Sequence, residues 1–456
     1  MTTANTKNIQ TQNFRKTEIK DFMENQLVDY ASYSTLRAIA SLADGAKNSG
    51  RKVIHTVQKK NITSKTKVTN LNSITSLETE YLHGDQVLND VIVGYARNFV
   101  GTNNLNILYP SGNFGTRFEP EASAPRYIFT YKEKIFDKIF NKEDNNILIH
   151  QTFEGTDIEP RFFVPNLPLI LLNGSEGIAT GFAQKILPRK LETIKDYIKS
   201  SLVGDSVPEL PPFYDGFNGV ISAGTKPNQW NIEGVFVRKG LTKITITELP
   251  IGYSLASYTK VLDDLEDKKI IRSYKDKSNA KTDSFEFDVN MDSKILKQSD
   301  DVVKAKLKLI KTVTENFTVI DENNKVVVYD SPYKVIDHYI KLKLHFLGLR
   351  KNYLIQKTKD DLLILASKYL FIKNIVDGNI TVNKVKKTDI IAQLKTYDKI
   401  ITVDGTYDYL LKMPIHSLTE EKLEELLEST KNKKTELQEI QNKTIESTWE
   451  EEIDTI

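Results

Sequence analysis

The sequence predicts a multidomain α+β protein that ends in a long antiparallel coiled coil. Its 456 residues are too many for one hydrophobic core, so two to four domains are expected. Amphipathic helices are predicted within residues 28–150, and short strand-like runs alternate with helices between residues 151 and 330. Beyond residue 331, apolar side chains recur at steps of three and four, which is the spacing of a coiled coil.

Composition narrows the class of protein. The net charge is +2 and cysteine is absent, so neither a disulfide framework nor a cysteine-based zinc site is expected. No apolar run approaches the ~20 residues that a membrane-spanning helix needs, and residues 1–20 lack a signal-peptide core. We therefore expect a soluble, cytoplasmic protein that does not associate with membranes.

Charge is distributed unevenly along the chain. Between residues 37 and 67, eight lysines and arginines stand against one acid, a net charge of +7. Between residues 416 and 456, five lysines stand against twelve acids, a net charge of −7. The basic block favours a polyanionic partner, although a solvated lysine-rich surface is the simpler alternative.

The N-terminal third is predicted to be a flexible arm followed by helices. Residues 1–27 are polar and lack periodicity. Helices are predicted at Tyr30–Leu42 and at Arg51–Lys60, joined by a glycine-containing turn, which is typical of a helix-turn-helix. A third amphipathic helix is predicted at Asp85–Val100.

The pair Arg126 and Tyr127 is the strongest candidate for chemistry. A phenol with a pKa near ~10 is ionised only about one part in a thousand at pH 7, so it needs a nearby cation to act as a nucleophile. Arg126 supplies that charge, and the strand-like run 128–130 follows. Taken alone, the pair is more often an arginine stacked beside a half-buried tyrosine.

The middle of the chain is predicted to alternate strands with helices. Residues 132–140 have helical spacing, and the glycine-rich stretch 171–181 is predicted to open another helix. This stretch lacks the Gly-Lys-Ser/Thr ending of a phosphate-binding loop. A helix at 254–267 and a hairpin at 317–329 complete this part.

The C-terminal part is predicted to be a helical hairpin. Ser331 and Pro332 start the first long helix, a small insert occupies 377–413, and a capping box at Ser417 starts the returning helix, which ends near Trp449. A generic helical bundle remains the alternative.

Several motifs in this order resemble those of type IIA DNA topoisomerases. They are RAIASLADGAKNSGRKVIHTV at 37–57, YLHGD at 81–85, SGNFGTRF at 111–118, APRYIFT at 124–130 and the glycine-rich block at 159–181. In length and content the chain is similar to the DNA-cleaving medium subunits of T-even-type phage topoisomerases. The resemblance covers residues 28–456, and it implies a host-cytoplasmic location if the chain is phage-encoded.

The resemblance implies three domains after the arm at 1–27. A winged-helix DNA-cleavage domain would cover residues 28–150 and an α/β tower domain residues 151–330. A coiled coil with a small C-terminal dimerisation gate would cover residues 331–456.

The resemblance also implies roles for individual residues. The catalytic residues would be Tyr127, Arg126, Arg37 and His83. The DNA-binding residues would be Lys47, Arg51, Lys52, Tyr81, Asn113 and Ile178. Ile178 would wedge between base pairs and bend the duplex, although a buried core isoleucine is the alternative. Lys52 stands where gyrase-like members have an arginine and so lacks the bidentate fork.

The implied function is transient double-strand breakage of DNA through a 5′-phosphotyrosyl link, for relaxation or decatenation. No DxD motif and no phosphate loop are present, so we expect Mg²⁺ to be held, and ATP to be used, by a partner subunit, and neither by this chain alone. The expected partners are duplex DNA, a second copy of the chain, and an ATPase- and Toprim-bearing topoisomerase subunit. The alternatives are a non-catalytic DNA-architectural scaffold and a meiotic-type break-forming protein.

Overall fold

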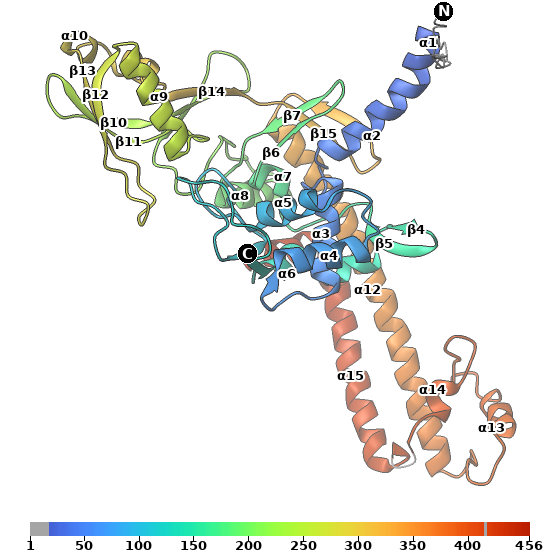
Figure 1. Ribbon diagram of the computed structural model, residues 1–456. Coiled ribbons are helices and arrows are strands. Elements are labelled where there is room, and N and C mark those ends of the chain that lie inside the picture. The colour runs from blue at the N-terminus through green and yellow to red at the C-terminus, as the bar shows by residue number, and fades with distance from the viewer. Residues whose placement is uncertain (1–17, 415–416) are drawn as a thin grey trace, which may run out of the picture.

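A computed structural model describes residues 18–414 and 417–456, arranged as a body, an outer lobe and a helical arm (Figure 1). The body holds the largest hydrophobic core, drawn from residues 40–210 and 317–453. The outer lobe, residues 235–309, has a core of its own, as does the tip of the arm at 365–426. The predicted α+β class is confirmed.

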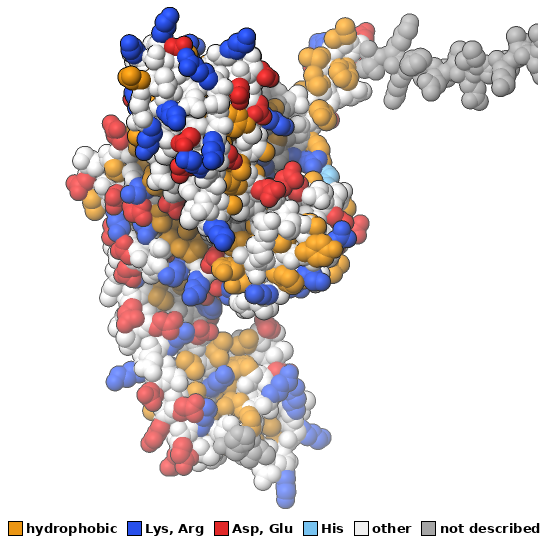
Figure 2. Space-filling model, turned by 60° about the vertical axis from the view of Figure 1, so that its left-hand side comes forward, with side chains coloured by type: hydrophobic (Ala, Val, Ile, Leu, Met, Phe, Trp, Pro, Cys, Tyr) orange, Lys and Arg blue, Asp and Glu red, His pale blue; other side chains and the backbone are white. Residues whose placement is uncertain are grey.

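The N-terminal helix projects from the body (Figure 1). It runs continuously through α1 (Ile19–Asp21), the π-helical turn η1 (Phe22–Leu27) and α2 (Val28–Ala38). The prediction of a flexible arm at 1–27 is therefore wrong from Ile19 onward, because apolar residues at helical spacing continue upstream of Val28; residues 1–17 lie outside the described part. Hydrophobic side chains lie exposed along this helix beside the grey trace in Figure 2.

Helix α2 ends four residues earlier than predicted. The segment that follows is extended and buried, because Ala40 N donates to Gln184 Oε1 (3.1 Å) and Leu42 N donates to Ile320 O (2.8 Å). These bonds to distant parts of the chain replace the next helical turn, which local spacing alone favours.

The first half of the body combines helices with a small sheet. Its elements are α3 (Asn48–Lys59), β1 (Thr66–Lys67), α4 (Val68–Glu78), α5 (Asp85–Ala96), β2 (Leu108–Ser111), β3 (Phe129–Lys132), α6 (Phe136–Ile139) and η2 (Lys142–Asn146). Helices α3, α4 and α5 pack on one another, and the antiparallel sheet has the order β1-β3-β2. Most of the helix predicted at 132–140 is absent, because Lys132 pairs with Leu108 in the sheet.

The second half of the body contains three hairpins. Its elements are β4 (His150–Phe153), β5 (Thr156–Pro160), α7 (Leu169–Leu172), β6 (Ser175–Ile178), β7 (Ala183–Ile186), α8 (Leu191–Val203), β15 (Phe317–Ile320) and β16 (Val326–Tyr329). The helix predicted to open at 171–181 is instead the hairpin β6–β7. Gly174 and Gly181 have positive φ angles of 72° and 83°, which suit turns rather than a helix start. The hairpin predicted at 317–329 is confirmed.

The outer lobe is built on an antiparallel sheet. Its order is β10 (Val235–Arg238), β11 (Lys243–Glu248), β13 (Phe287–Met291) and β12 (Ile271–Asp276). The lobe also contains α9 (Leu255–Asp267), α10 (Ser293–Leu296) and α11 (Asp300–Lys306). A second sheet, β14 (Ile310–Thr314), β9 (Gln229–Glu233) and β8 (Val220–Ala223), joins the lobe to the body. The predicted helix at 254–267 corresponds to α9.

The arm is an antiparallel pair of long helices (Figure 1). Helix α12 (Pro332–Val376) starts at the predicted Ser331 and packs against α15 (Glu420–Asn442). Between them lie α13 (Lys387–Leu394) and α14 (Asp408–Leu411). The cap of α15 is Thr419 rather than Ser417, because the Thr419 hydroxyl accepts a bond from Lys422 N. The last helix is also divided, since α16 (Ile445–Asp454) begins after a break at Lys443.

No helix within residues 18–414 and 417–456 has an apolar stretch long enough to cross a membrane. The C-terminal helix α16 instead packs into the body. Trp449 is fully buried there, and its Nε1 donates to the carbonyl of Asn166 at 3.0 Å.

We predict that Trp449→Phe lowers the free energy of unfolding of the body by about 3 kcal/mol, because it leaves a cavity and an unpaired carbonyl. Urea titration followed by far-UV circular dichroism measures the change. The matched control is Leu427→Ala on α15, whose side chain is half exposed and should cost less than about 0.5 kcal/mol. Equal losses in the two variants would contradict the conclusion that Trp449 holds α16 in the body.

Candidate active site

Tyr127 lies in an exposed turn directly before β3. Its backbone N–H donates to Ala124 O at 2.9 Å, and 69% of the residue is accessible to solvent. The guanidinium of Arg126 lies over the phenol ring, 5.3 Å from its centroid. Ile128 is buried and anchors the turn to the sheet. The phenol is therefore open to a large substrate and has a cation beside it.

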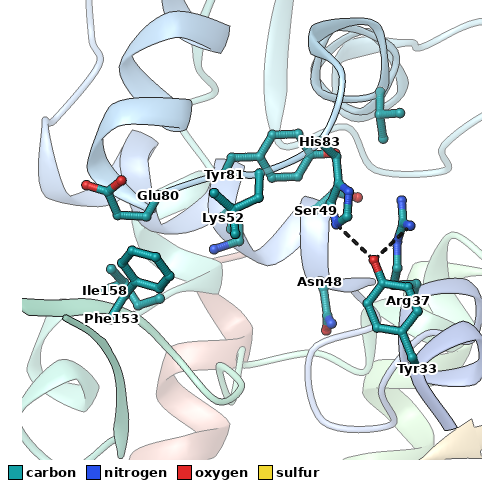
Figure 3. A pocket seen from close by; sticks show the side chains of 12 residues that line it. Tyr33, Arg37, Asn48, Ser49, Lys52, Glu80, Tyr81, His83, Phe153 and Ile158 are labelled. Atoms are coloured by element: carbon teal, nitrogen blue, oxygen red, sulfur yellow. Dashed lines mark hydrogen bonds between the residues drawn. The ribbon is translucent and has the colours of Figure 1, made fainter. Parts of the chain in front are cut away.

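A second cluster joins Tyr33, Arg37 and His83 (Figure 3). Arg37 Nη1 donates to Tyr33 Oη at 3.1 Å, and His83 Nε2 lies 3.2 Å from the same oxygen. The cluster lines a pocket of about 250 Å³ between α2, α3, the segment before α5 and the hairpin β4–β5. Tyr81 packs edge-on against His83, and burial raises the pKa of its phenol.

Sequence reasoning did not assign Tyr33 to the site. Tyr33 falls within the helix predicted at Tyr30–Leu42 but is not among the predicted site residues. Its spacing of four residues from Arg37 places both side chains on one face of α2, and that spacing was the available signal.

The two clusters are separate in this structure. Within the described residues, no hydrogen bond or ring contact connects Tyr127 or Arg126 with Arg37 or His83. The predicted grouping of these four residues around one phosphate therefore remains a prediction.

Ile178 lies at the tip of the hairpin β6–β7. It is 82% exposed, so the alternative of a core isoleucine is wrong. Gly177 allows the hairpin to approach α2 closely, because a Cβ atom at this position would lie 2.0 Å from the carbonyl oxygen of Ala38. Lys47 Nζ donates to Glu176 O at 2.8 Å beside it, and burial lowers the pKa of that lysine.

Arg51 and Lys52 form ion pairs with acidic residues of the protein itself. Arg51 is 7% exposed, and its Nε donates to Asp44 Oδ2 at 2.7 Å. Lys52 Nζ lies 2.8 Å from Glu159 and also donates to Thr79 O. The contact of Arg51 is at odds with its predicted DNA contact, because a buried, paired cation is not presented to a phosphate. Lys52 is partly exposed and lines the pocket beside His83, so its DNA contact stays a prediction.

The positive charge that the basic block offers at the surface is reduced further by Glu78, which pairs with both Lys59 and Lys60. Lys65 is exposed and has no ion pair within the described residues. The predicted charge of this segment therefore overstates what its surface offers to a polyanion.

Asn113 is exposed, but its side chain already has a structural role. Its Oδ1 accepts a bond from Gly115 N at 2.9 Å, and its carbonyl accepts one from Ser123 N at 3.0 Å. These bonds fold the glycine-rich loop that precedes Tyr127. A contact of Asn113 with DNA stays a prediction.

The residues around Tyr127 do not fit a metal site. Across residues 18–414 and 417–456, no group of three or more histidine, aspartate or glutamate side chains is placed to hold a metal ion.

The fold is that of a type IIA topoisomerase breakage-reunion domain. The structure matches the crystal structure of the Plasmodium falciparum topoisomerase II DNA-binding, cleavage and re-ligation domain, with a TM-score of 0.86 and 34% identity over 95% of this chain and 63% of that one.

The family model of the A-type subunits of DNA gyrase/topoisomerase IV matches residues 37–454, and the chain belongs to this family. Among curated proteins it is 34% identical to DNA topoisomerase 2 of Plasmodium falciparum, over 96% of this chain and 34% of that protein. It is 33% identical to the mitochondrial DNA topoisomerase 2 of Dictyostelium discoideum, over 94% and 34% respectively. The chain thus spans about a third of the length of these relatives. The resemblance to phage medium subunits stays a prediction.

We predict that Arg51→Met destabilises the body by about 3 to 5 kcal/mol, because it leaves the carboxylate of Asp44 buried without its cation. Thermal unfolding measures the loss. The double variant with Asp44→Asn should lose less than the sum of the two single changes. Lys65→Met, from the same basic block, is the control and should change stability by less than about 0.5 kcal/mol. A neutral Arg51→Met would contradict the structural role of this arginine.

A pH prediction follows from His55 on α3. Burial, together with the charge of Lys59, lowers its pKa from 6.5 to about 4. His150, Glu78 and Lys52 also face the ring. As the pH falls, His55 takes up a proton in the unfolded chain at a higher pH than in the folded chain. The contribution of neutral His55 to the stability of the folded state is therefore fully present above pH 6.5 and is lost as the pH falls toward 4.

His55 should therefore cost about 2 kcal/mol of stability between pH 7 and pH 5. His55→Leu removes that titration, and its Nε2 has no hydrogen-bond partner to lose. Urea titrations of both proteins at several pH values give the difference in slope. Parallel pH dependences would show that His55 is protonated equally in the folded and unfolded states.

Proposed function

We propose that this chain is the DNA-cleaving and religating part of a type II topoisomerase, with Tyr127 as the nucleophile. The observation that carries the proposal is the exposed phenol with the Arg126 guanidinium over its ring. Its position in a fold that matches a DNA-binding, cleavage and re-ligation domain supports the same conclusion.

The proposed step is an in-line displacement at a DNA phosphorus. The phenol oxygen of Tyr127 forms a bond to phosphorus, and the bond from phosphorus to the 3′-oxygen breaks. The electron pair of that bond leaves with the 3′-oxygen, which takes up a proton from solvent to become a hydroxyl, and the phenol proton passes to solvent, which reaches the exposed side chain. The product is a 5′-phosphotyrosyl diester, and attack by the 3′-hydroxyl reverses the step.

Arg126 stabilises the phenolate that develops during attack. Its positive charge lies over the phenol ring and attracts the negative charge that builds up on the phenol as it attacks. Arg37 and His83, together with Tyr33, form a second polar site at the surface. In this proposal they stabilise the negative charge of the DNA phosphate that Tyr127 attacks.

The remaining assignments belong to the same proposal. Residues 28–150 act as a winged-helix cleavage domain, supported by the packing of α3, α4 and α5 beside a three-stranded sheet. Residues 151–330 act as a tower along the duplex, and residues 331–456 act as a coiled coil and dimerisation gate. Ile178 bends the duplex by insertion, at a cost of a few kcal/mol in stacking that is offset by additional contact.

Two copies would cut the two strands, and a partner subunit would supply Mg²⁺ and use ATP to drive strand passage, giving relaxation or decatenation. The religation step needs no nucleotide, because one phosphodiester replaces another. None of the steps assigned to Tyr127 and Arg126 depends on how the partner holds its metal.

We predict that Tyr127→Phe abolishes covalent attachment of the protein to DNA. The chain is combined with the metal-bearing subunit, supercoiled plasmid and magnesium, and is then denatured with detergent and treated with protease. Wild type should give linear DNA whose ends resist a 5′→3′ exonuclease but not a 3′→5′ exonuclease.

The matched control is Tyr109→Phe, another exposed tyrosine on the same sheet, which should retain the adduct. An adduct formed by Tyr127→Phe would show that another residue is the nucleophile. If wild type forms no adduct but still binds DNA, the chain is a scaffold rather than an enzyme.

A further inference from the structure

The loop before Tyr127, residues 112–124, is held by two arginines that the proposed chemistry does not use. Arg97 reaches it from the end of α5, and Arg117 connects it to the outer lobe. We call this segment the pre-tyrosine loop. Its position determines where the turn that carries Tyr127 begins.

Arg97 grips the pre-tyrosine loop at two points. Its Nε donates to Phe114 O at 3.3 Å, and its Nη2 donates to Pro120 O at 2.8 Å. These carbonyls flank a tight turn in which Thr116 N donates to Glu119 O at 2.9 Å. The rigid fork of one guanidinium therefore closes the base of this turn.

The geometry at the end of α5 aims Arg97 at the loop. The residue caps the helix in an extended conformation, with φ −60° and ψ 137°, so its side chain leaves the line of the helical face. Among the ion pairs of the described residues none involves Arg97, and the hydrogen bonds of its side chain there go to the two loop carbonyls. Its guanidinium also lies 5.9 Å from the ring centroid of Phe99. A cation without an acid, bonded to two carbonyls of one loop, serves that loop.

The other side of the loop is anchored in the outer lobe. Arg117 is buried, pairs with Glu248 at 2.6 Å and donates to Leu249 O at 2.7 Å. Phe118 stacks on Phe285 with ring centroids 4.7 Å apart and belongs to the core of that lobe. The pre-tyrosine loop is thus shared between the body and the outer lobe.

The loop is too tightly folded to absorb a displacement internally. A Cβ atom on Gly115, which has a φ of 94°, would lie 2.5 Å from the carbonyl oxygen of Pro120. Ser123 N donates to Asn113 O, and Tyr127 N donates to Ala124 O. A shift of the loop is therefore passed along these bonds to the turn that carries the phenol.

We propose that Arg97 is a positioning residue for Tyr127, and that the pre-tyrosine loop couples the placement of the outer lobe to the reach of the phenol. The proposal rests on the function proposed above. Misplacing a reacting group by about 1 Å costs on the order of a hundredfold in rate, so a small shift of the loop has a measurable effect.

The test is Arg97→Ala, compared with Arg97→Lys, in the complete complex with its partner subunit. At saturating DNA, the single-turnover rate of adduct formation should fall roughly tenfold to a hundredfold in the alanine variant. The lysine variant keeps the positive charge but loses the planar fork whose two nitrogens reach the two carbonyls, so it should lie between alanine and wild type. DNA affinity measured by fluorescence anisotropy should stay within about twofold, since Arg97 bonds protein carbonyls and not the substrate.

Two measurements separate positioning from a loss of folding. Added guanidinium ion at concentrations that leave wild type unaffected should restore part of the rate of Arg97→Ala and none of the rate of Tyr127→Phe. The control is Lys351→Ala, because Lys351 also bonds two carbonyls, those of Gln441 and Lys443, but lies in the arm. This variant should cleave DNA at the wild-type rate.

The outcomes distinguish this inference from the proposed function. If wild type forms the adduct, Tyr127→Phe does not, and Arg97→Ala matches wild type, then the positioning role fails alone. A loss confined to DNA affinity, or one that guanidinium does not restore, also overturns it. If Tyr127→Phe retains the adduct, the proposed function fails before Arg97 is considered.

Discussion

The body depends on the buried carboxylate of Asp44. Its two oxygens accept bonds from the backbone N–H groups of Ala46 and Phe163, each at 3.0 Å, and from the guanidinium of Arg51. One side chain therefore fixes the loop after α2, the start of α3 and the segment that leads to α7. Because charges are costly to bury, the carboxylate is stable there only while every one of these donors is present. The helices that present Arg37 and Lys47 take their relative positions from this junction.

Much of the architecture follows from local patterns in the chain. Helix α12 begins at its Ser-Pro signal, and the hairpin at 317–329 has the alternation that predicts it. The errors have one physical origin, which is that backbone groups found partners far away in the sequence. Ala40 bonds the side chain of Gln184, and this contact ends α2 early. Glycines near residue 177 serve a hairpin as readily as a helix start, and only the approach to Ala38 decides between them.

The candidate site was predicted only in part, again because important contacts join residues that are far apart in the sequence. The pair Arg126 and Tyr127 before a strand-like run predicts a tyrosine with a cation beside it, and the structure has the exposed phenol just before β3 with the guanidinium over its ring. Charge was less informative, because sequence records the sign of a side chain but not its partner. Glu159 neutralises Lys52 from more than a hundred residues away, so no local count of charges reveals it. The sequence does not single out Tyr33, because a tyrosine at helical spacing fits the buried face of a helix as well as it fits a functional site.

The two long helices of the arm are joined to the body in different ways. Helix α12 passes from the body to the arm tip as one rod of 45 residues, about 68 Å at 1.5 Å per residue. Its partner is interrupted at Lys443, where the α15 helix stops and α16 begins. The arm thus consists of one continuous helix and a second helix that is interrupted where it meets the body. The interruption is nevertheless tied to the continuous helix, because Lys351 Nζ on α12 donates to the carbonyls of Gln441 and Lys443, so the two sides of the arm are fastened to each other where the second one changes direction.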